Sequence, residues 1–483
     1  MYRYFVLLVV LVSCTKDKII PNYNVLAKVG DRIITDQDFI RRAEYTIRPD
    51  YCKGNSYIHK KIILNNLIAE KLLAIEAMPL FDKQDFPAFE NFIKGRREQS
   101  MRQLLYFNKG YSRAEIDNNE LDYYYKKAGR TFEVEYFSYP DGEFADSLIS
   151  AINDGFSLKD IYQANINDSI PTRKVGWFDP NNEIINQALF LDNPEKGEII
   201  GPAKLDDGTY FIIQVKGWTD QINLSETGTK ERLEKVIRSL KERRANDIYK
   251  KYIKDVMLGK TIQLNENVFI EYANSVSDKF FTTRKEKESA ITDALFRGSE
   301  FLAISDIKPL DKRFQSLNLF SINGDSWTVE DFEKSLKSHP LVFRKKKMSQ
   351  LEFPSQFKMA IVDFVQDHFL TLKAYELNLH ENKTVKLNER LWADSFMAYQ
   401  SANILMAGRS DGSHQPTVMK PIIDDLQNKY NKEIFIDMNL FESIQISNLD
   451  MFVTQGNVPY PIVVPQFPSY TDDNVLDYGS TIN

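Results

Sequence analysis

The sequence predicts an α+β fold, in which helical units with small hairpins at both ends of the chain flank a central antiparallel sheet with packed helices. Three observations lead to this prediction. Segments with apolar residues at helical spacing occur near both ends, strand-like and short helical segments alternate over residues 131–219, and two short hairpins each precede a helix-capping pattern. The 483 residues suffice for about three domains of ~100–200 residues each.

Composition and charge exclude several classes of function. Hydrophobic residues make up 43% of the chain and aromatic residues 12%, which is enough for packed cores. The 62 Lys and Arg residues against 68 Asp and Glu residues give a net charge of −6, which disfavours binding to nucleic acid. The five histidines are scattered and never stand at metal-ligand spacing, so we expect no metal and no cofactor.

The first fourteen residues have the pattern of a secretory signal. Arg3 precedes an apolar run over residues 5–12, which is too short to span ~30 Å of hydrocarbon. The run ends in Leu11-Val12-Ser13-Cys14, which resembles a bacterial lipobox. The resemblance implies a signal peptide over residues 1–13, lipidation of Cys14 and a tether over residues 14–24, whereas the alternative is an ordinary signal peptide with a chance cysteine. With Cys14 lipidated, Cys52 has no disulfide partner in the chain.

The position after the cysteine bears on the membrane. Thr15 stands there in place of the aspartate that retains some lipoproteins at the inner membrane. We therefore expect the protein in the cell envelope, lipid-anchored, at the outer membrane and facing the periplasm.

The N-terminal unit is predicted over residues 25–127. It begins with a hairpin around Gly30-Asp31, and Thr35 with Asp38 has the spacing of a capping box for the helix that follows. Longer helices are predicted over residues 59–77, 86–106 and 112–127.

A second unit with the same opening is predicted over residues 320–483. Asn323-Gly324 favours a tight hairpin turn, and Thr328 with Asp331 repeats the capping spacing. The alternative is a coincidence between two capped helices. A helix is predicted over residues 357–377 and a strand over 434–446, and four prolines after Val458 favour an extended tail that lies along the surface or hangs free. A charged amphipathic helix over residues 226–257 lies in a predicted connector, 221–319.

The central unit, residues 128–220, alternates strands and short helices. Strands are predicted over residues 132–139 and 209–217, with helical segments over 141–154, 156–162 and 183–191 between them. Five short segments, in this order, resemble a parvulin-type (PpiC-type) peptidyl-prolyl isomerase domain. They are Gly155-Phe156, Gly176-Trp177-Phe178, Ala188-Leu189-Phe190, the stretch from Gly197 to Pro202 and the stretch from Tyr210 to Val215. The hairpin, capped helix and apolar helix before it resemble the N-terminal chaperone segment of the SurA/PrsA-type foldases.

The resemblance implies a peptide-binding pocket on this sheet but not its usual chemistry. Parvulins place one histidine on the first strand and one on the last, and here those positions fall near Tyr136 and Phe211, with no histidine between His59 and His339. Catalytic residues are therefore unknown. The candidate peptide-binding residues are Tyr136, Phe178, Ile185, Phe190 and Phe211, and the alternative is that they form the core of a small domain.

The function implied is that of a membrane-anchored chaperone for unfolded outer-membrane or secreted polypeptides, with weak or absent prolyl isomerisation. One alternative is an active isomerase with a rearranged site. Another is a structural subunit of an envelope secretion or assembly complex.

Overall fold

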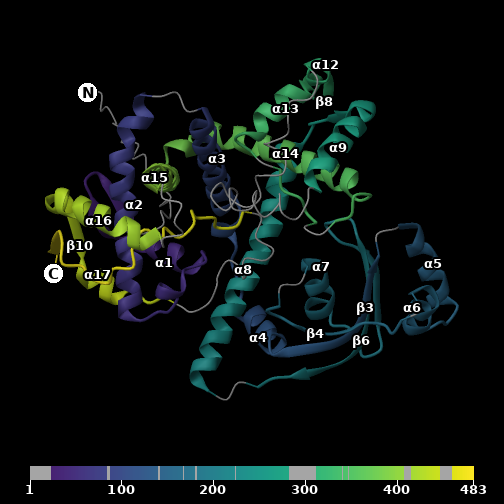
Figure 1. Cartoon of the computed structure of the whole chain (residues 1–483). Helices are drawn as coiled ribbons and strands as arrows, with labels where there is room; N and C mark the ends of the chain where they lie inside the picture. Colours follow the sequence, from purple (N-terminus) through teal and green to yellow (C-terminus); the bar gives the residue numbers. More distant parts are fainter. Residues whose placement is uncertain are drawn as a thin grey trace, which may run out of the picture.

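The computed structural model describes residues 23–482, apart from residues 84–86, 140–141, 167, 180–181, 223–224, 282–311, 340, 346–347, 407–414 and 447–459. The predicted α+β class is confirmed, because long helices surround three small sheets. The strand orders are β11-β10-β1-β2, β4-β3-β6-β5 and β7-β8-β9. Figure 1 labels strands of all three sheets among the helices. Cys14, with the predicted signal peptide, lies outside the described residues.

The N-terminal hairpin and its capped helix form as predicted. Strands β1 (Val25–Val29) and β2 (Arg32–Thr35) lead into α1 (Asp36–Glu44). Thr35 Oγ1 accepts from the Asp38 backbone N–H at 3.0 Å, and Asp38 Oδ2 accepts from the Thr35 N–H at 3.1 Å, which completes the capping box. The apolar helices α2 (Tyr57–Lys83) and α3 (Pro87–Lys109) follow.

The prediction of one helix over residues 112–127 is wrong at its start. A 3₁₀ turn covers Tyr111–Arg113, and α4 spans Asn118–Lys127 only. The cause is Asp117, whose carboxylate accepts from the Asn119 N–H at 2.8 Å and starts the helix there.

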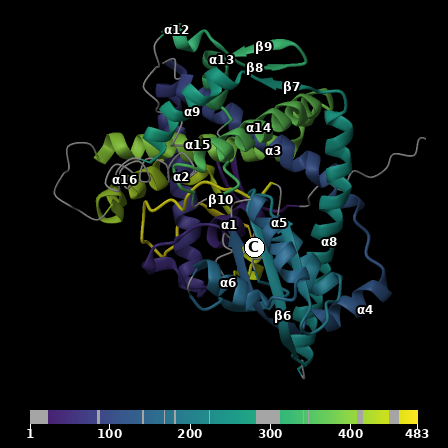
Figure 2. The same ribbon diagram turned by 90° about the vertical axis from the view of Figure 1, so that its right-hand side faces the viewer.

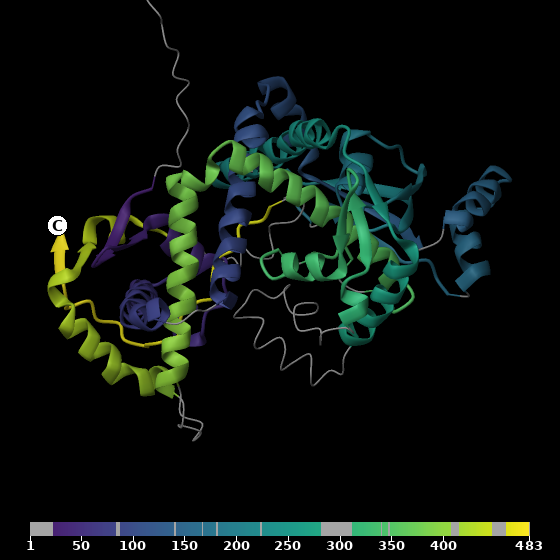
Figure 3. The same cartoon turned by 90° about the horizontal axis from the view of Figure 1, so that it is seen from above.

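Both ends of the chain contribute to one core. Strand β10 (Ile434–Asp437) pairs antiparallel with β1, and β11 (Ser480–Ile482) pairs parallel with β10. Helices α15 (Lys383–Met406) and α16 (Gln415–Lys429) pack on α2. Figure 3 shows these yellow-green C-terminal helices beside the purple N-terminal elements. Buried residues of both ends, such as Leu26, Phe39, Ile434 and Phe441, therefore lie in a single hydrophobic cluster.

Two C-terminal predictions differ from the structure in instructive ways. The strand predicted over residues 434–446 is wrong beyond Asp437, because the Asp437 carboxylate accepts from the Leu440 N–H at 2.9 Å and caps α17 (Met438–Ser443). The predicted non-helical path of the tail is confirmed over residues 460–478, and the tail does not hang free but lies along the protein with some residues exposed and others buried. Phe467 and Tyr470 are buried, and the Asn66 side chain of α2 binds the tail backbone.

The second hairpin also forms as predicted. Strands β8 (Asn318–Ile322) and β9 (Asp325–Thr328) precede α13 (Val329–Leu336), which has a capping box made by Thr328 and Asp331. Asn323 and Gly324 have φ values of 53° and 94°, as a tight hairpin turn requires. Helices α9 (Glu266–Phe280), α12 (Lys312–Gln315) and α14 (Phe353–Glu376) and strand β7 (Ile262–Leu264) complete this unit.

The central unit is a four-stranded antiparallel sheet with helices on both faces. Its elements are β3 (Arg130–Tyr139), α5 (Gly142–Asn153), α6 (Leu158–Ile166), β4 (Thr172–Gly176), α7 (Glu183–Asn186), a π-helical turn (Gln187–Leu191), β5 (Ile199–Lys204) and β6 (Tyr210–Asp220). Helices α5 and α6 cover one face, whereas α7 and the long α8 (Glu226–Met257) lie against the other. Figure 2 shows α8 running from the three-stranded sheet to the level of the central sheet.

Candidate functional site

The central sheet brings together the two strands on which the predicted site depends. Strands β3 and β6 pair antiparallel, with Tyr136 opposite Ile213 and Ser138 opposite Phe211. Because side chains alternate along a strand, Tyr136 and Phe211 point to the same face, where both belong to one hydrophobic cluster. The predicted adjacency of these strands is therefore confirmed.

The five predicted binding residues differ in accessibility. Phe190 and Phe211 are 0% and 2% exposed, and the Phe190 ring packs 5.2 Å from Phe132 and 5.5 Å from Trp177. Tyr136 and Ile185 are half-buried at the edge of the same cluster, and Phe178 lies outside it with 45% of its surface exposed. Phe190 and Phe211 are thus core residues in this conformation, and peptide contact by any of the five stays a prediction.

The acid–base groups near this sheet include two stacked tyrosines and the ion pair of Glu183 with Arg243 at 2.9 Å. Tyr139 and Tyr210 stack with their ring centres 5.8 Å apart at the end of β3 and β6, and burial raises the pKa of Tyr139 to about 12. A phenol with so high a pKa is a hydrogen-bond donor at neutral pH and not a general base. The arrangement can hold an apolar or aromatic group, and an imidazole pair is absent because the sequence has none in this region.

A second site lies where the two ends of the chain meet α8. A cavity of about 570 Å³ opens between α1, α3, α8, α15 and the tail at residues 460–464. Six aromatic side chains line it: Tyr23, Tyr45, Tyr106, Phe107, Tyr111 and Tyr460. No local sequence pattern marks this site, because its walls come from segments as far apart as Tyr23 and Val464. Only the aromatic residues crowded over positions 106–111 could have hinted at it.

The charged groups of this cavity balance. Asp38 and Glu242 face Arg41 and Arg238, two anions against two cations. Burial raises the pKa of Glu242, and the charge of Arg238 opposes that rise. Burial likewise raises the pKa of Tyr106 to about 12, with Glu242 adding to the shift. The four charged residues of the lining therefore leave no excess charge that would select an anion or a cation.

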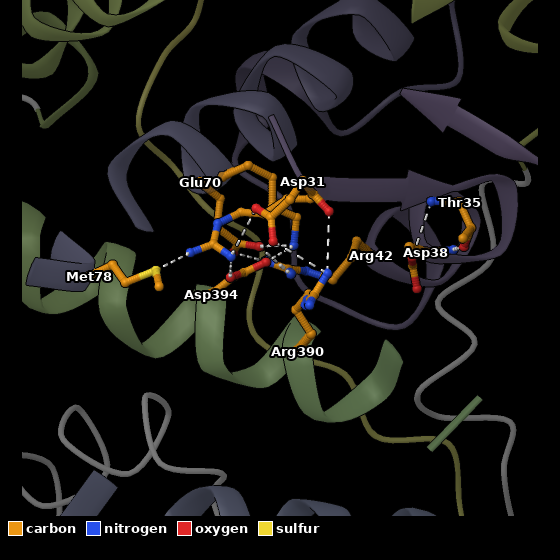
Figure 4. Close-up of polar contacts among 10 residues, drawn as sticks. Asp31, Thr35, Asp38, Arg42, Glu70, Met78, Arg390 and Asp394 are labelled. Atoms are coloured by element: carbon orange, nitrogen blue, oxygen red, sulfur yellow. Dashed lines mark hydrogen bonds and ion pairs between the residues drawn. The ribbon is translucent and has the colours of Figure 1, made fainter. Parts of the chain in front are cut away.

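A buried ion cluster forms the framework beside this cavity. Arg42 of α1 makes a bidentate pair with Glu70 of α2, at 3.1 and 2.7 Å, and donates to the Gln466 carbonyl of the tail at 2.5 Å. Lys71 donates to Asp394 of α15 at 2.9 Å, and Arg32 lies 3.2 Å from the same carboxylate. Figure 4 shows the side chains of Arg42, Glu70 and Asp394 close together. All five charged side chains are at most 6% exposed, so the cluster joins four segments where water does not screen the charges.

Among the described residues, no group of three or more His, Cys, Asp or Glu side chains could hold a metal ion. No described helix has both the length and the apolar character to cross a bilayer. A scan against known protein families finds none that matches the chain, and a search of curated proteins finds no match either.

Proposed function

We propose that this protein is a membrane-anchored envelope chaperone that binds unfolded exported polypeptides, with parvulin ancestry and weak or absent isomerase activity. The observation that carries the proposal is the pairing of β3 with β6, which sets Tyr136 and Phe211 on one apolar face where the parvulin resemblance places its pocket. Tyr136 and Ile185, half-buried at the edge of that face, support binding of apolar or proline-containing segments there. The absence of histidine between His59 and His339 argues against the family's usual catalysis.

The lipobox-like end of the predicted signal supports the anchored location. Acyl chains on Cys14 would contribute ~0.8 kcal/mol per buried CH₂, and two or more chains hold a protein stably at a membrane. The clients in this proposal are outer-membrane or secreted proteins before they fold.

The test is a light-scattering assay of an unfolded outer-membrane protein diluted from urea, with proline isomerisation of a model peptide measured in parallel. We expect the protein to delay aggregation near equimolar ratios, while isomerisation stays close to the uncatalysed rate. Fast isomerisation that is lost on replacing Tyr136 or Phe211 would favour an active isomerase instead. No delay of aggregation, together with capture of a single stoichiometric partner from envelope extracts, would favour an assembly subunit.

A further inference from the structure

The cavity between α1, α3, α8, α15 and the tail has walls suited to side chains of a polypeptide. Besides its six aromatic residues it is lined by six aliphatic ones: Leu104, Leu387, Leu391, Ile462, Val463 and Val464. Its volume of about 570 Å³ falls in the ~300–1,000 Å³ range of pockets that enclose small ligands. It can therefore take a segment of a few residues and not a folded domain.

Two hydroxyl groups in these walls have unused hydrogen-bonding capacity. Tyr23 Oη and Thr384 Oγ1 are buried and have no hydrogen-bond partner among the described residues. Buried polar atoms are nearly always paired in folded proteins, and leaving one unpaired is costly. Neither oxygen is accessible to solvent, so a peptide N–H or C=O group would pair with it once the side chain turns toward the cavity.

The tail adds a row of unused backbone groups to the same cavity. Its backbone is held at both sides, since Gln103 Nε2 donates to the Pro461 carbonyl at 2.6 Å and Arg42 donates to the Gln466 carbonyl. Between these points Val463 and Val464 make no backbone hydrogen bond within the part of the chain that the structure describes. A fixed, extended and unpaired backbone has the properties of an exposed sheet edge, which pairs readily with another strand.

The equal numbers of acidic and basic residues in the cavity lining disfavour strongly charged ligands. Asp38 and Glu242 offset Arg41 and Arg238, so a phosphate-bearing ligand finds no net positive charge here. An uncharged, dipolar chain with apolar side chains matches the walls, the hydroxyls and the backbone together.

We infer that this cavity binds an extended, mainly apolar polypeptide segment, which adds as a strand to the tail backbone at Val463 and Val464. The inference rests on the proposed chaperone function and assigns its client contact to this cavity. The occupant is an unfolded client segment. Its backbone would supply most of the hydrogen bonds, so recognition would depend little on client sequence.

The experiment measures binding of a fluorescent synthetic peptide of alternating Val/Tyr and Ser/Thr residues to the full chain. Val463→Pro removes one N–H from the tail, and Val463→Ala is its matched control because it keeps the N–H and loses more of the side chain. We expect Val463→Pro to weaken binding about tenfold and Val463→Ala to change it by less than about threefold. Circular dichroism and melting curves of both variants verify that they fold.

A change in the peptide gives the same test without touching the protein. N-methylation of alternate peptide residues removes the donors of one edge, and methylation in one of the two registers should again cost about tenfold. A photo-crosslinker at Leu387 in the cavity should capture the peptide, and one at the exposed Leu377 should not.

Two failures are distinguishable. Unchanged binding of Val463→Pro and of both methylated peptides, in a protein that still suppresses aggregation, would refute the cavity as the client site and leave the chaperone function standing. Absence of both peptide binding and aggregation suppression would overturn both proposals.

Discussion

Replacing Asn66 by alanine should release the C-terminal tail from the N-terminal helices. Asn66 is fully buried on α2, and its amide group satisfies three backbone groups of the tail. Its Oδ1 accepts from the N–H groups of Tyr470 at 2.7 Å and Thr471 at 3.0 Å, and its Nδ2 donates to the Thr471 carbonyl at 2.7 Å. Asn66→Ala leaves these three buried groups without partners. At ~1–3 kcal/mol for each unpaired group, the expected loss of unfolding free energy is about 3–9 kcal/mol.

The measurement combines urea unfolding, followed by circular dichroism, with hydrogen exchange at Tyr470 and Thr471. The unfolding free energy should fall by that amount, and the two amides should exchange much faster than in the unmodified protein. Asn119→Ala is the matched control, because Asn119 is exposed on α4 and its side chain makes no hydrogen bond to the described residues. Its effect should stay within about 0.5 kcal/mol. A loss below about 1 kcal/mol for Asn66→Ala, with slow exchange retained, would refute the view that the tail is held through its backbone.

Three further changes test other features. Phe190→Ala should cost about 3–5 kcal/mol in thermal or urea unfolding, because the ring is fully buried, whereas Phe178→Ala should leave stability nearly unchanged; equal effects would show that the core is misassigned. Arg42→Met should lower the unfolding free energy by about 3–5 kcal/mol, because it leaves the buried Glu70 carboxylate without its ion-pair partner. Adding Glu70→Leu should restore part of that loss. Additive losses in the double-mutant cycle would contradict the coupling between the two residues. Hydrogen bonds from Lys345 and Ser349 lower the pKa of Glu352 from 4.5 to about 2. The ionised Glu352 therefore stabilises the fold fully above pH 4.5, and this stabilisation is lost as the pH falls to about 2. Glu352→Gln should therefore destabilise the protein at pH 7 and make no difference near pH 2, and a difference that persists at pH 2 would exclude this cause.

Local signals in the sequence predicted the local structure well. Thr35 with Asp38 and Thr328 with Asp331 predicted both capping boxes, because a cap depends only on residues within one helical turn. The alternation around Tyr136 and Tyr210–Val215 predicted β3 and β6 for the same reason. Asp117 and Asp437 are caps of the same kind that the sequence analysis overlooked, and both errors in element boundaries follow from them.

Contacts between distant segments were beyond the reach of such signals. The pairing of β1 with β10 joins residues about four hundred positions apart, and nothing in either strand specifies the other. The ion cluster and the cavity depend on that pairing, since Arg42, Asp394 and Val463 meet only after the two ends have packed together. The solvent exposure of single aromatic residues could not be predicted from the sequence either. An aromatic residue can belong to the core or to a binding face, as Phe190 and Phe178 illustrate.

The packing of the chain's last residues against its first helices has a consequence for the order of folding. Contacts this far apart in sequence are entropically costly to form and tend to form late. The apolar faces of helix α2 and strand β1 therefore stay uncovered until residues 434–482 have been synthesised and have reached the same compartment. The central sheet draws its strands from within residues 130–220 and can close much earlier. A nascent chain paused before residue 434 should hence expose an apolar N-terminal region beside an already folded central sheet. The protein would therefore need protection from aggregation during its own maturation.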